Sequence, residues 1–536
     1  MRSFGGSLLL GLSAATFFLS PVAEPLLRLT PAKLYFLRRA PERLDYLILL
    51  GLVLAIGLIA GFTYEVAPRF GPWLRRALEV PLWLLWVLGL EHVIHLHLSR
   101  YPPLWNSVAA SMNRIGLSAV DGWFVVGFLC SLAVLAGFYL SPRAWTFAKP
   151  FLCGGAAVVW LGCAWKLVQT PSLPPETRAG GSQVRQIRET GPGSPVVWII
   201  LDEWDYDLTY RRNDGKVFPE FDRLRQQAMF LENVRSAGKA TLIAIPSLLT
   251  GKPVRDYRPA SASAARFLSV TASEPFPASG TIFDTANQLG YRSQIVGWYH
   301  TYCRMFGSQV DSCWWDDLLL PALRPGRPVL ERASAFLRDS IELEILPVAG
   351  PTNNIIKQLA RVNPMIEEAS RVAQFRGWAF SFLHLPVPHA PFFKLDENGQ
   401  MIPLPTDAAG YQSGLDAADR AVGKIRAAME QSGAWDEALV VVTSDHPYRY
   451  QFGGGYGNGH IPMMIKFPHQ SSPVLYSGPF QAVETRRFLE DFMQGKLATA
   501  ERAVTWMDQA TSAHGKHSTG EPRMPIPEPV TDWGNP

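Results

Sequence analysis

The stretch PVVWIILDE, residues 195–203, decides the class of fold. Its apolar run has the length of a strand and ends in two acids, Asp202 and Glu203. A strand with one solvent-exposed face alternates apolar and polar residues. An unbroken apolar run therefore predicts a strand buried on both faces, as in a parallel sheet. The stretch EALVVVTSDH, residues 437–446, repeats the pattern much later in the chain.

Helical patterns alternate with strand patterns between these two stretches. Residues 280–298 and 414–442 each predict a helix followed by a strand, and AFSFLHL at 379–385 predicts one more buried strand. Parallel strands need crossover connections, which helices usually supply. The sequence therefore predicts an α/β domain whose mostly parallel sheet is covered by helices on both faces, with an irregular helical insertion at 319–378.

The N-terminal third is apolar enough to cross a membrane. The whole chain is 48% hydrophobic with a mean hydropathy of +0.04, which is high for a soluble protein. A membrane-spanning helix needs about 20 predominantly apolar residues. Stretches of this kind predict an N-terminal bundle of four or five transmembrane helices, near 5–22, 46–64, 79–97, 123–141 and 150–168.

Composition also predicts the boundaries of the parts. A stretch rich in Pro, Gly and Ser follows the last apolar segment and has the character of a linker. The C-terminal end has a similar composition without apolar periodicity, which is typical of disorder. We expect a membrane domain at 1–168, a linker at 169–194, a globular domain at 195–510 and a disordered tail at 511–536.

Charge and cysteine content bear on partners and location. A net charge of +4 with 18% charged residues forms no basic stripe, so nucleic acid is not an expected partner. Basic residues in 22–45 would keep that segment, and after four more spans the globular domain, in the cytoplasm. Against this, Cys303 and Cys313 could close a small loop as a disulfide, which needs an oxidising compartment. We therefore expect the domain outside the cytoplasm, with two unpaired cytoplasmic thiols as the alternative.

Polar residues collect where the two buried strands end. In an open parallel sheet, ligands bind beyond the carboxyl ends of the strands, where Asp202 with Glu203 and Asp445 with His446 are expected. Neighbouring side chains point to opposite faces of a continuing strand, so both members of a pair converge only where the strand has ended. Clustered carboxylates with an imidazole predict a divalent metal, because unneutralised acids repel one another. The alternative is that each residue caps a helix or shapes a turn.

Three histidines add to this set. The run GNGHIPMMIKFP places His460 just before another apolar strand. The run LHLPVPHAPFFKL places His384 near the end of a strand and His389 in the Pro-rich loop that follows it. Loops carry a large share of binding and catalytic residues, although each of these could also be a core histidine with satisfied hydrogen bonds.

These motifs together resemble the sulfatase-like branch of the alkaline phosphatase superfamily. VVWIILDEWDYD, TLIAIPSLLTG, LHLPVPHAPF, VVVTSDH and GHIPMMIKFP stand in the order and surroundings found in that branch, across residues 195–470. The resemblance implies the fold of that superfamily and makes the globular domain a sulfatase-like catalytic domain.

Thr241 occupies the position of the nucleophile in this resemblance. Sulfatases of the family use Cys-x-Pro-x-Arg, or Ser in place of Cys, and a formylglycine forms only from Cys or Ser, so Thr241 excludes that route. TLIAIP resembles the arrangement in membrane-tethered phosphoethanolamine transferases, lipoteichoic-acid synthases and nucleotide pyrophosphatases, which use a nucleophilic Thr. A Thr hydroxyl needs a metal or a base to activate it. A helix beginning at Thr241 would also favour an anionic ester at its N-terminus.

The resemblance implies roles for the other residues as well. One divalent metal would be bound by Asp202, Thr241, Asp445 and His446, and Glu203 matches a further acid that is a ligand in sulfatases but not in the transferases. An imidazole in the set favours zinc or manganese over calcium or magnesium. His389 and His460 would hold the ester oxygens or assist the leaving group. Apart from the resemblance, Lys239 and His384 are further candidates for contacts to the substrate, with an ordinary solvated lysine as the alternative for Lys239.

The sequence thus predicts a membrane-anchored, metal-dependent, sulfatase-like enzyme that cleaves or transfers a phosphate or sulfate ester group through Thr241. Because Thr241 stands in place of the Cys or Ser that forms formylglycine, we expect a phosphate ester rather than a sulfate ester. The expected partners are the lipid bilayer and an envelope lipid or glycan, and the expected place is the inner membrane with the catalytic domain on the periplasmic side. The alternative is a catalytically inactive sulfatase-like domain that binds envelope glycans or scaffolds a membrane complex. It is motivated by Pro447, which stands where the family's Ser-Asp-His-Gly motif has Gly.

Overall fold

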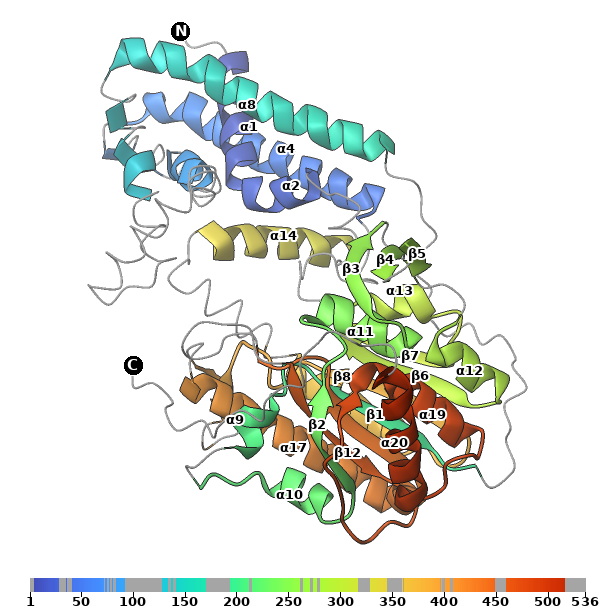
Figure 1. Cartoon of the computed structure of the whole chain (residues 1–536). Helices are drawn as coiled ribbons and strands as arrows, with labels where there is room; N and C mark the ends of the chain where they lie inside the picture. The colour runs from blue at the N-terminus through green and yellow to red at the C-terminus, as the bar shows by residue number, and fades with distance from the viewer. Residues whose placement is uncertain are drawn as a thin grey trace. The chain divides into compact units, whose positions relative to one another are not determined.

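The chain forms two compact units whose segments interleave along the sequence. The first unit comprises residues 1–30, 38–176 and 319–354, and the second comprises 31–37, 177–318 and 355–536. The computed structural model (Figure 1) describes residues 4–27, 35, 41–71, 73–74, 77, 80, 83–91, 128–133, 136–137, 141–169, 193–211, 215–260, 264–269, 273–276, 280–316, 328–344, 359, 361–395, 397, 401–404, 408–448 and 459–515.

The first unit is helical over the residues that are described. Its helices are α1 (Phe4–Phe18), α2 (Ser20–Leu27), α4 (Arg43–Val66), the short 3-10 helix η1 (Ala67–Arg69), α8 (Pro142–Gln169) and α14 (Val329–Glu344).

Close packing of α1 on α4 depends on small residues. A Cβ atom added to Gly11 would overlap the backbone of Gly57 and Gly61, and one added to Gly61 would overlap the backbone of Leu8. Small residues that let two helix backbones approach are typical of helix contacts in membranes.

Two helices of this unit could cross a membrane by length and composition. They are α4 and the Pro150–Val168 part of α8, with hydropathies of 2.4 and 1.7. α1 is apolar but shorter, and only about half of each predicted span near 79–97 and 123–141 lies within the described residues. The structure therefore supports two candidate spans, and the bundle of four or five remains a prediction.

The insertion predicted at 319–378 divides between the two units. Its helix α14 packs against α2 and α4 in the first unit. Arg332 of α14 lies 2.8 Å from Glu42 and 3.4 Å from Asp45 at the beginning of α4, and the side chain of Phe336 is buried. The sequence between β7 and β8 of the second unit thus supplies a helix to the first unit.

The second unit holds a mixed sheet and the helices that cover it. The strands are β1 (Val196–Leu201), β2 (Met229–Arg235), β3 (Val254–Pro259), β4 (Ala265–Ser269), β5 (Ser273–Phe276), β6 (Arg292–Trp298), β7 (Ser312–Asp316), β8 (Ala379–Leu385), β9 (Phe393–Leu395), β10 (Met401–Pro403), β11 (Leu439–Ser444), β12 (His460–Lys466), β13 (Val474–Tyr476) and β14 (Phe480–Gln481). The helices are α9 (Tyr206–Tyr210), α10 (Pro219–Arg225), α11 (Thr241–Thr250), α12 (Ile282–Gln288), α13 (Tyr302–Phe306), α16 (Val362–Ala373), α17 (Ala408–Ser432), α18 (Ala434–Glu437), η3 (Ala482–Glu484), α19 (Thr485–Met493) and α20 (Ala500–Gly515).

The central sheet has the order β13-β2-β12-β11-β1-β8-β6-β7, with β14 also pairing with β2. β1 pairs in parallel with β11 and β8, whereas β12 runs antiparallel to both of its neighbours, β11 and β2. The carboxyl ends of β1, β8, β11 and β2 therefore meet at one edge together with the amino end of β12. The mostly parallel sheet that the sequence predicts is confirmed, with β12 as the exception.

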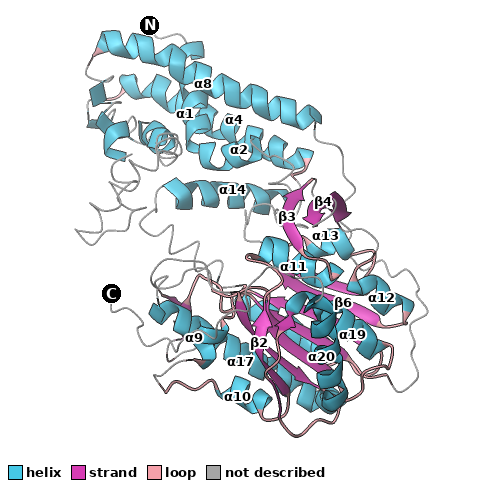
Figure 2. Cartoon of the chain, in the orientation of Figure 1, coloured by secondary structure: helices cyan, strands magenta, loops and turns pink. Residues whose placement is uncertain are grey.

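Alternate residues of β1 enter two different cores. Val196, Trp198 and Ile200 belong to one buried cluster, which also includes residues of α11, α12, α19 and α20. Val197, Ile199 and Leu201 belong to another, which includes residues of α10, α16 and α17. Figure 2 shows α10, α11, α12, α17, α19 and α20 around the strands of the sheet. Both faces of the sheet are covered, which explains why β1 shows no polar alternation.

The end of the chain partly lies outside the described residues. The predicted disordered tail begins at residue 511, but α20 continues to Gly515, so helix extends past that boundary. Residues 516–536 lie outside the described part of the chain.

One buried carboxyl in this fold gives a testable pH dependence. Asp419 of α17 accepts a hydrogen bond from the backbone N–H of Phe221 near the beginning of α10, at 2.8 Å. Burial raises the pKa of Asp419 to about 6 from an ordinary 3.8. A raised pKa stabilises the fold fully below about pH 4, and that contribution is lost as the pH rises through about 6.

Asp419→Asn keeps the accepting oxygen and removes the buried charge. We expect the variant to gain about 1 kcal/mol of unfolding free energy relative to the wild type between pH 5 and pH 8. Thermal unfolding in detergent at pH 5 and at pH 8 measures this change in stability. Asp416→Asn, on the same helix, is the control. An advantage of Asp419→Asn that is equal at the two pH values would contradict the expectation.

Candidate active site

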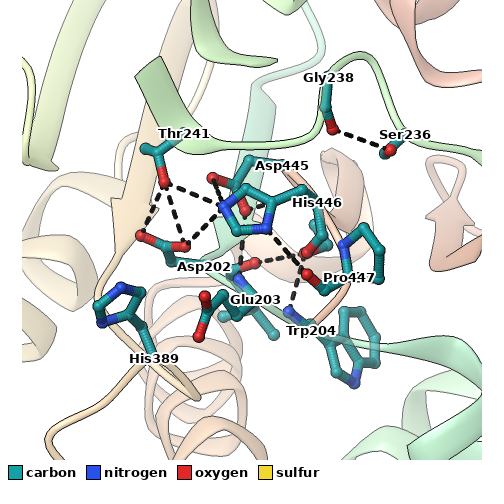
Figure 3. A network of polar contacts seen from close by, with 12 residues as sticks. Asp202, Glu203, Trp204, Ser236, Gly238, Thr241, His389, Asp445, His446 and Pro447 are labelled. Atoms are coloured by element: carbon teal, nitrogen blue, oxygen red, sulfur yellow. Dashed lines mark hydrogen bonds and ion pairs between the residues drawn. The ribbon is translucent and has the colours of Figure 1, made fainter. Parts of the chain in front are cut away.

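Strand ends bring the predicted residues to one edge of the sheet. β1 ends at Leu201 and β11 at Ser444, so Asp202, Asp445 and His446 all lie beyond the last strand residue. All three side chains are fully buried. Because β11 ends before Asp445, the neighbouring side chains of Asp445 and His446 can converge, and both are part of one polar cluster (Figure 3).

Thr241 is the first residue of α11, on the segment that follows β2. Its Oγ1 lies 3.4 Å from each carboxylate oxygen of Asp202 and 3.2 Å from Nε2 of His446. The side chain is only 3% exposed. The stretch that ends in the turn Thr250-Gly251 is therefore a short helix with the hydroxyl at its positive end, and Gly251 closes it in the left-handed conformation at φ 65°.

The hydrogen bonds of His446 orient its ring. Nδ1 lies 2.9 Å from the carbonyl oxygen of Pro447. A carbonyl only accepts, so Nδ1 carries the hydrogen and Nε2 of the neutral ring presents a lone pair. Nε2 lies 3.6 Å from Asp202 and 3.5 Å from Asp445, facing the cluster. Pro447, which departs from the family motif, thus supplies the carbonyl that fixes the tautomer.

His384 joins the cluster from the neighbouring strand β8. Its Nε2 lies 3.9 Å from Asp202, and one ligand atom each from His384, Asp202 and Asp445 fall within 4.8 Å of one another. Tyr302 holds the other ring nitrogen at 2.8 Å. Burial lowers the pKa of His384 to about 3, so its ring is neutral at neutral pH. The role expected of His384 is a contact to the substrate, whereas the geometry groups it with Asp202 and Asp445.

Buried polar atoms at this point fit a divalent metal. Within the described residues, Nε2 of His384 and Oδ2 of Asp445 are buried without a hydrogen-bond partner. Such atoms cost free energy unless something binds them. Burial opposes ionisation of Asp445, but the rings of His446 and His384 and the N–H groups of Glu203 and His446 outweigh it, and the pKa of Asp445 lies below its ordinary value. A buried carboxylate beside imidazoles is a donor set that a divalent metal takes.

Glu203 contributes through its backbone. Its N–H donates to Oδ1 of Asp445 at 3.2 Å, and its carbonyl accepts from the hydroxyl of Tyr411 at 2.7 Å. Glu203 has a φ of 68°, which is uncommon for a residue with a side chain and turns the chain sharply after Asp202. The metal-ligand role predicted for its carboxylate remains a prediction.

The remaining predicted residues differ in position. His389 is half-buried on the loop after β8, with its ring against Trp298 at 5.0 Å between centroids, and Figure 3 draws it beside the cluster. His460 is engaged elsewhere, by Asp207 at 3.2 Å and by the carbonyl of Glu232 at 2.7 Å. Lys239 is exposed on the segment before α11.

Cys303 and Cys313 are joined by a disulfide. It links α13 to β7, next to Tyr302, which contacts His384. A disulfide is the state expected of an oxidising compartment.

His300, which the sequence does not single out, lies behind Thr241. It follows β6 by two residues, and its Nε2 lies 3.1 Å from the backbone carbonyl of Thr241. The available signal was its place just beyond the carboxyl end of a predicted strand, the same signal that identified Asp202.

Comparison with known proteins agrees with the predicted family at the level of one domain. Residues 349–501 match the family model described as Sulfatase. This match includes α16, β8, α17, β11 and β12. The prediction of a sulfatase-like domain is confirmed, as is the enzyme class of a sulfatase-like hydrolase or transferase. No curated protein sequence matches the chain.

Several solved structures show a distant likeness. They include Ps i-CgsB, at 16% identity over 58% of this chain and 74% of that chain with a TM-score of 0.40. A protein in the alkaline phosphatase superfamily from Vibrio parahaemolyticus is 17% identical over 59% of this chain and 73% of that chain, with a TM-score of 0.37. The lipoteichoic acid synthase LtaP from Listeria monocytogenes is 14% identical over 59% of this chain and 76% of that chain, with a TM-score of 0.36.

Proposed function

We propose that this sulfatase-like enzyme cleaves or transfers a phosphate ester group of an envelope lipid or glycan through Thr241. The observation that carries the proposal is the position of the Thr241 hydroxyl. It lies at the beginning of a helix and within 3.4 Å of Asp202 and His446, in a buried cluster of acids and imidazoles. A hydroxyl without such neighbours would be a poor nucleophile at neutral pH.

Asp202, Thr241, Asp445 and His446 would hold one divalent metal, with His384 as a further donor from β8. Zinc or manganese suits the imidazoles among these donors. When bound, such a metal lowers the pKa of a coordinated hydroxyl and neutralises developing negative charge. The carbonyl of Pro447 aims the lone pair of His446, and the hydroxyl of Tyr302 fixes the orientation of the His384 ring, as orienting partners of metal ligands usually do.

Thr241 would lose its hydroxyl proton to water and attack the phosphorus atom, forming a bond from its oxygen while the bond to the leaving alkoxide breaks. The alkoxide would take up a proton and leave as the alcohol. The backbone N–H groups at the beginning of α11 favour the anionic oxygens of the ester. His389, half-buried beside the cluster, is our choice for a hydrogen bond to the leaving oxygen. A second acceptor, water or an envelope alcohol, would then take the group from Thr241.

The choice of substrate and location rests on three features. Thr241 cannot form formylglycine, which favours phosphate over sulfate. The candidate spans α4 and α8 would tether the enzyme to the inner membrane, near a lipid or a glycan of the envelope. The disulfide between Cys303 and Cys313 supports a periplasmic or other extracytoplasmic domain.

Turnover of model esters tests the proposal. Full-length protein in detergent is assayed with aryl phosphate monoester, phosphodiester and sulfate ester reporters, each with zinc or manganese. We expect metal-dependent cleavage of a phosphate reporter and a phosphorylated Thr241 in the mass spectrum of the quenched enzyme. Cleavage of the sulfate ester alone would contradict the choice of phosphate. A protein that binds no divalent metal and modifies no residue would instead be an inactive binding domain.

A further inference from the structure

Tyr35 belongs to the second unit although the chain on both sides of it belongs to the first. Residues 31–37 are counted with the second unit, between α2, which ends at Leu27, and α4, which begins at Arg43. The side chain of Tyr35 is fully buried in the core that also holds Tyr257, Tyr302 and Met305.

A line of hydrogen bonds joins Tyr35 to the nucleophile. The hydroxyl of Tyr35 lies 2.8 Å from Nδ1 of His300, and Nε2 of His300 lies 3.1 Å from the backbone carbonyl of Thr241. Tyr257 contacts the same hydroxyl of Tyr35 at 2.6 Å, and the sulfur of Met305 lies 3.2 Å from it. All of these side chains are buried.

Chemistry sets the direction of each bond. The carbonyl of Thr241 only accepts, so Nε2 of His300 donates to it. The ring of His300 is fully buried, which favours its neutral form, and a neutral ring that donates from Nε2 accepts at Nδ1. Burial also raises the pKa of Tyr35 above its ordinary value, which keeps the phenol protonated. Tyr35 therefore donates to His300, and the tautomer that holds Thr241 is the one that Tyr35 selects.

The beginning of α11 lacks an ordinary cap. Its N-cap residue is Ala240, which has no side chain able to accept from the free N–H groups of the first turn. The hydrogen bond from His300 to the carbonyl of Thr241 therefore helps to fix the backbone of Thr241. Orientation of the peptide at Thr241 sets where its Oγ1 points, toward Asp202 and His446.

We propose that Tyr35 is a positioning residue for the nucleophile, acting through His300 on the backbone of Thr241. The proposal rests on the proposed function, because it assigns Tyr35 to the same site. It makes a residue from the segment between two N-terminal helices part of the support of a site built from β1, β2 and β11. Small misplacement of a reacting group costs much rate, so the effect belongs to kcat rather than to substrate binding.

Tyr35→Phe in the full-length protein removes only the hydroxyl and keeps the ring. We expect kcat on the phosphate reporter to fall about tenfold, with KM changed less than about twofold. Each rate is normalised to the amount of metal bound to the protein, so that unfolded protein does not lower the apparent kcat. Tyr46→Phe is the matched control, because Tyr46 is also buried and its hydroxyl bonds the carbonyl of Leu26 in the first unit.

Amide hydrogen exchange gives a readout that needs no activity. The peptide covering residues 240–250 is expected to exchange about five- to tenfold faster in Tyr35→Phe than in the wild type or in Tyr46→Phe. If the wild type cleaves no reporter, the proposed function fails, and this exchange still decides whether Tyr35 orders the beginning of α11.

A double substitution tests the path through His300. His300→Asn keeps a polar group near the position of Nδ1 and loses the reach to the carbonyl of Thr241. We expect it to slow kcat as Tyr35→Phe does, and the double variant to be no slower than His300→Asn alone. Unchanged kcat and unchanged exchange in Tyr35→Phe would overturn the proposal, and so would strictly multiplicative effects of the two substitutions.

Discussion

Replacing Thr241 by alanine is expected to lower kcat by roughly three to five orders of magnitude, because it removes the oxygen that forms the covalent intermediate. KM for the reporter should change far less. The measurement is steady-state turnover of the phosphate reporter, together with mass spectrometry of the peptide that contains residue 241. Thr241→Ser keeps a hydroxyl and is expected to retain measurable turnover.

Thr250→Ala is the control for this experiment. Thr250 ends the same helix, and its hydroxyl bonds the carbonyl of Pro246 within α11. Its loss should affect the stability of the helix end and leave kcat within about threefold. Full turnover by Thr241→Ala would remove Thr241 from the mechanism, whatever the other variants do.

The second large effect concerns metal binding by Asp445. Asp445→Asn keeps an oxygen that accepts from the N–H groups of Glu203 and His446, which lie 3.2 and 2.7 Å from Oδ1 in the wild type. It replaces the unpartnered, buried Oδ2 with an amide nitrogen, which cannot ligate a metal. We expect affinity for zinc or manganese to fall roughly a hundredfold or more, and turnover with it.

Thermal unfolding with and without metal measures this loss. In the wild type, metal at about a hundred times its dissociation constant should stabilise the fold by about 2.7 kcal/mol, and Asp445→Asn should lose most of that gain. Asp436→Asn, at an exposed position of α18 just before β11, serves as the control. Equal metal stabilisation in Asp445→Asn and the wild type would show that the metal, if bound, lies elsewhere.

The sheet could be predicted from the sequence because its strands are locally distinct. β1, β8 and β11 are continuous apolar runs, and their ends identify Asp202 and Asp445 without any knowledge of pairing. The direction of β12 could not be predicted, because a strand buried on both faces has the same pattern whichever way it runs. That reversal is what brings His460 to the same edge as the carboxyl ends.

The residues behind the site could not be predicted, because they are distant in the sequence. Tyr35 and His300 are hydrogen-bonded although they are 265 residues apart. No local pattern marks Tyr35, which lies in a segment that reads as the connection between two apolar helices. Likewise, the amphipathic character of α14 predicts a helix but not that its partners are α2 and α4.

The interleaving of the two units bears on how the enzyme is made and how it can be recombined. Tyr35 is synthesised long before β6 and α13. Its side chain can therefore reach its buried position only after those later elements have been synthesised. A gene fragment for residues 177–536 would encode α14 without α2 and α4, exposing Phe336, and would lack Tyr35 altogether. Neither unit can therefore be exchanged at a single junction in the sequence.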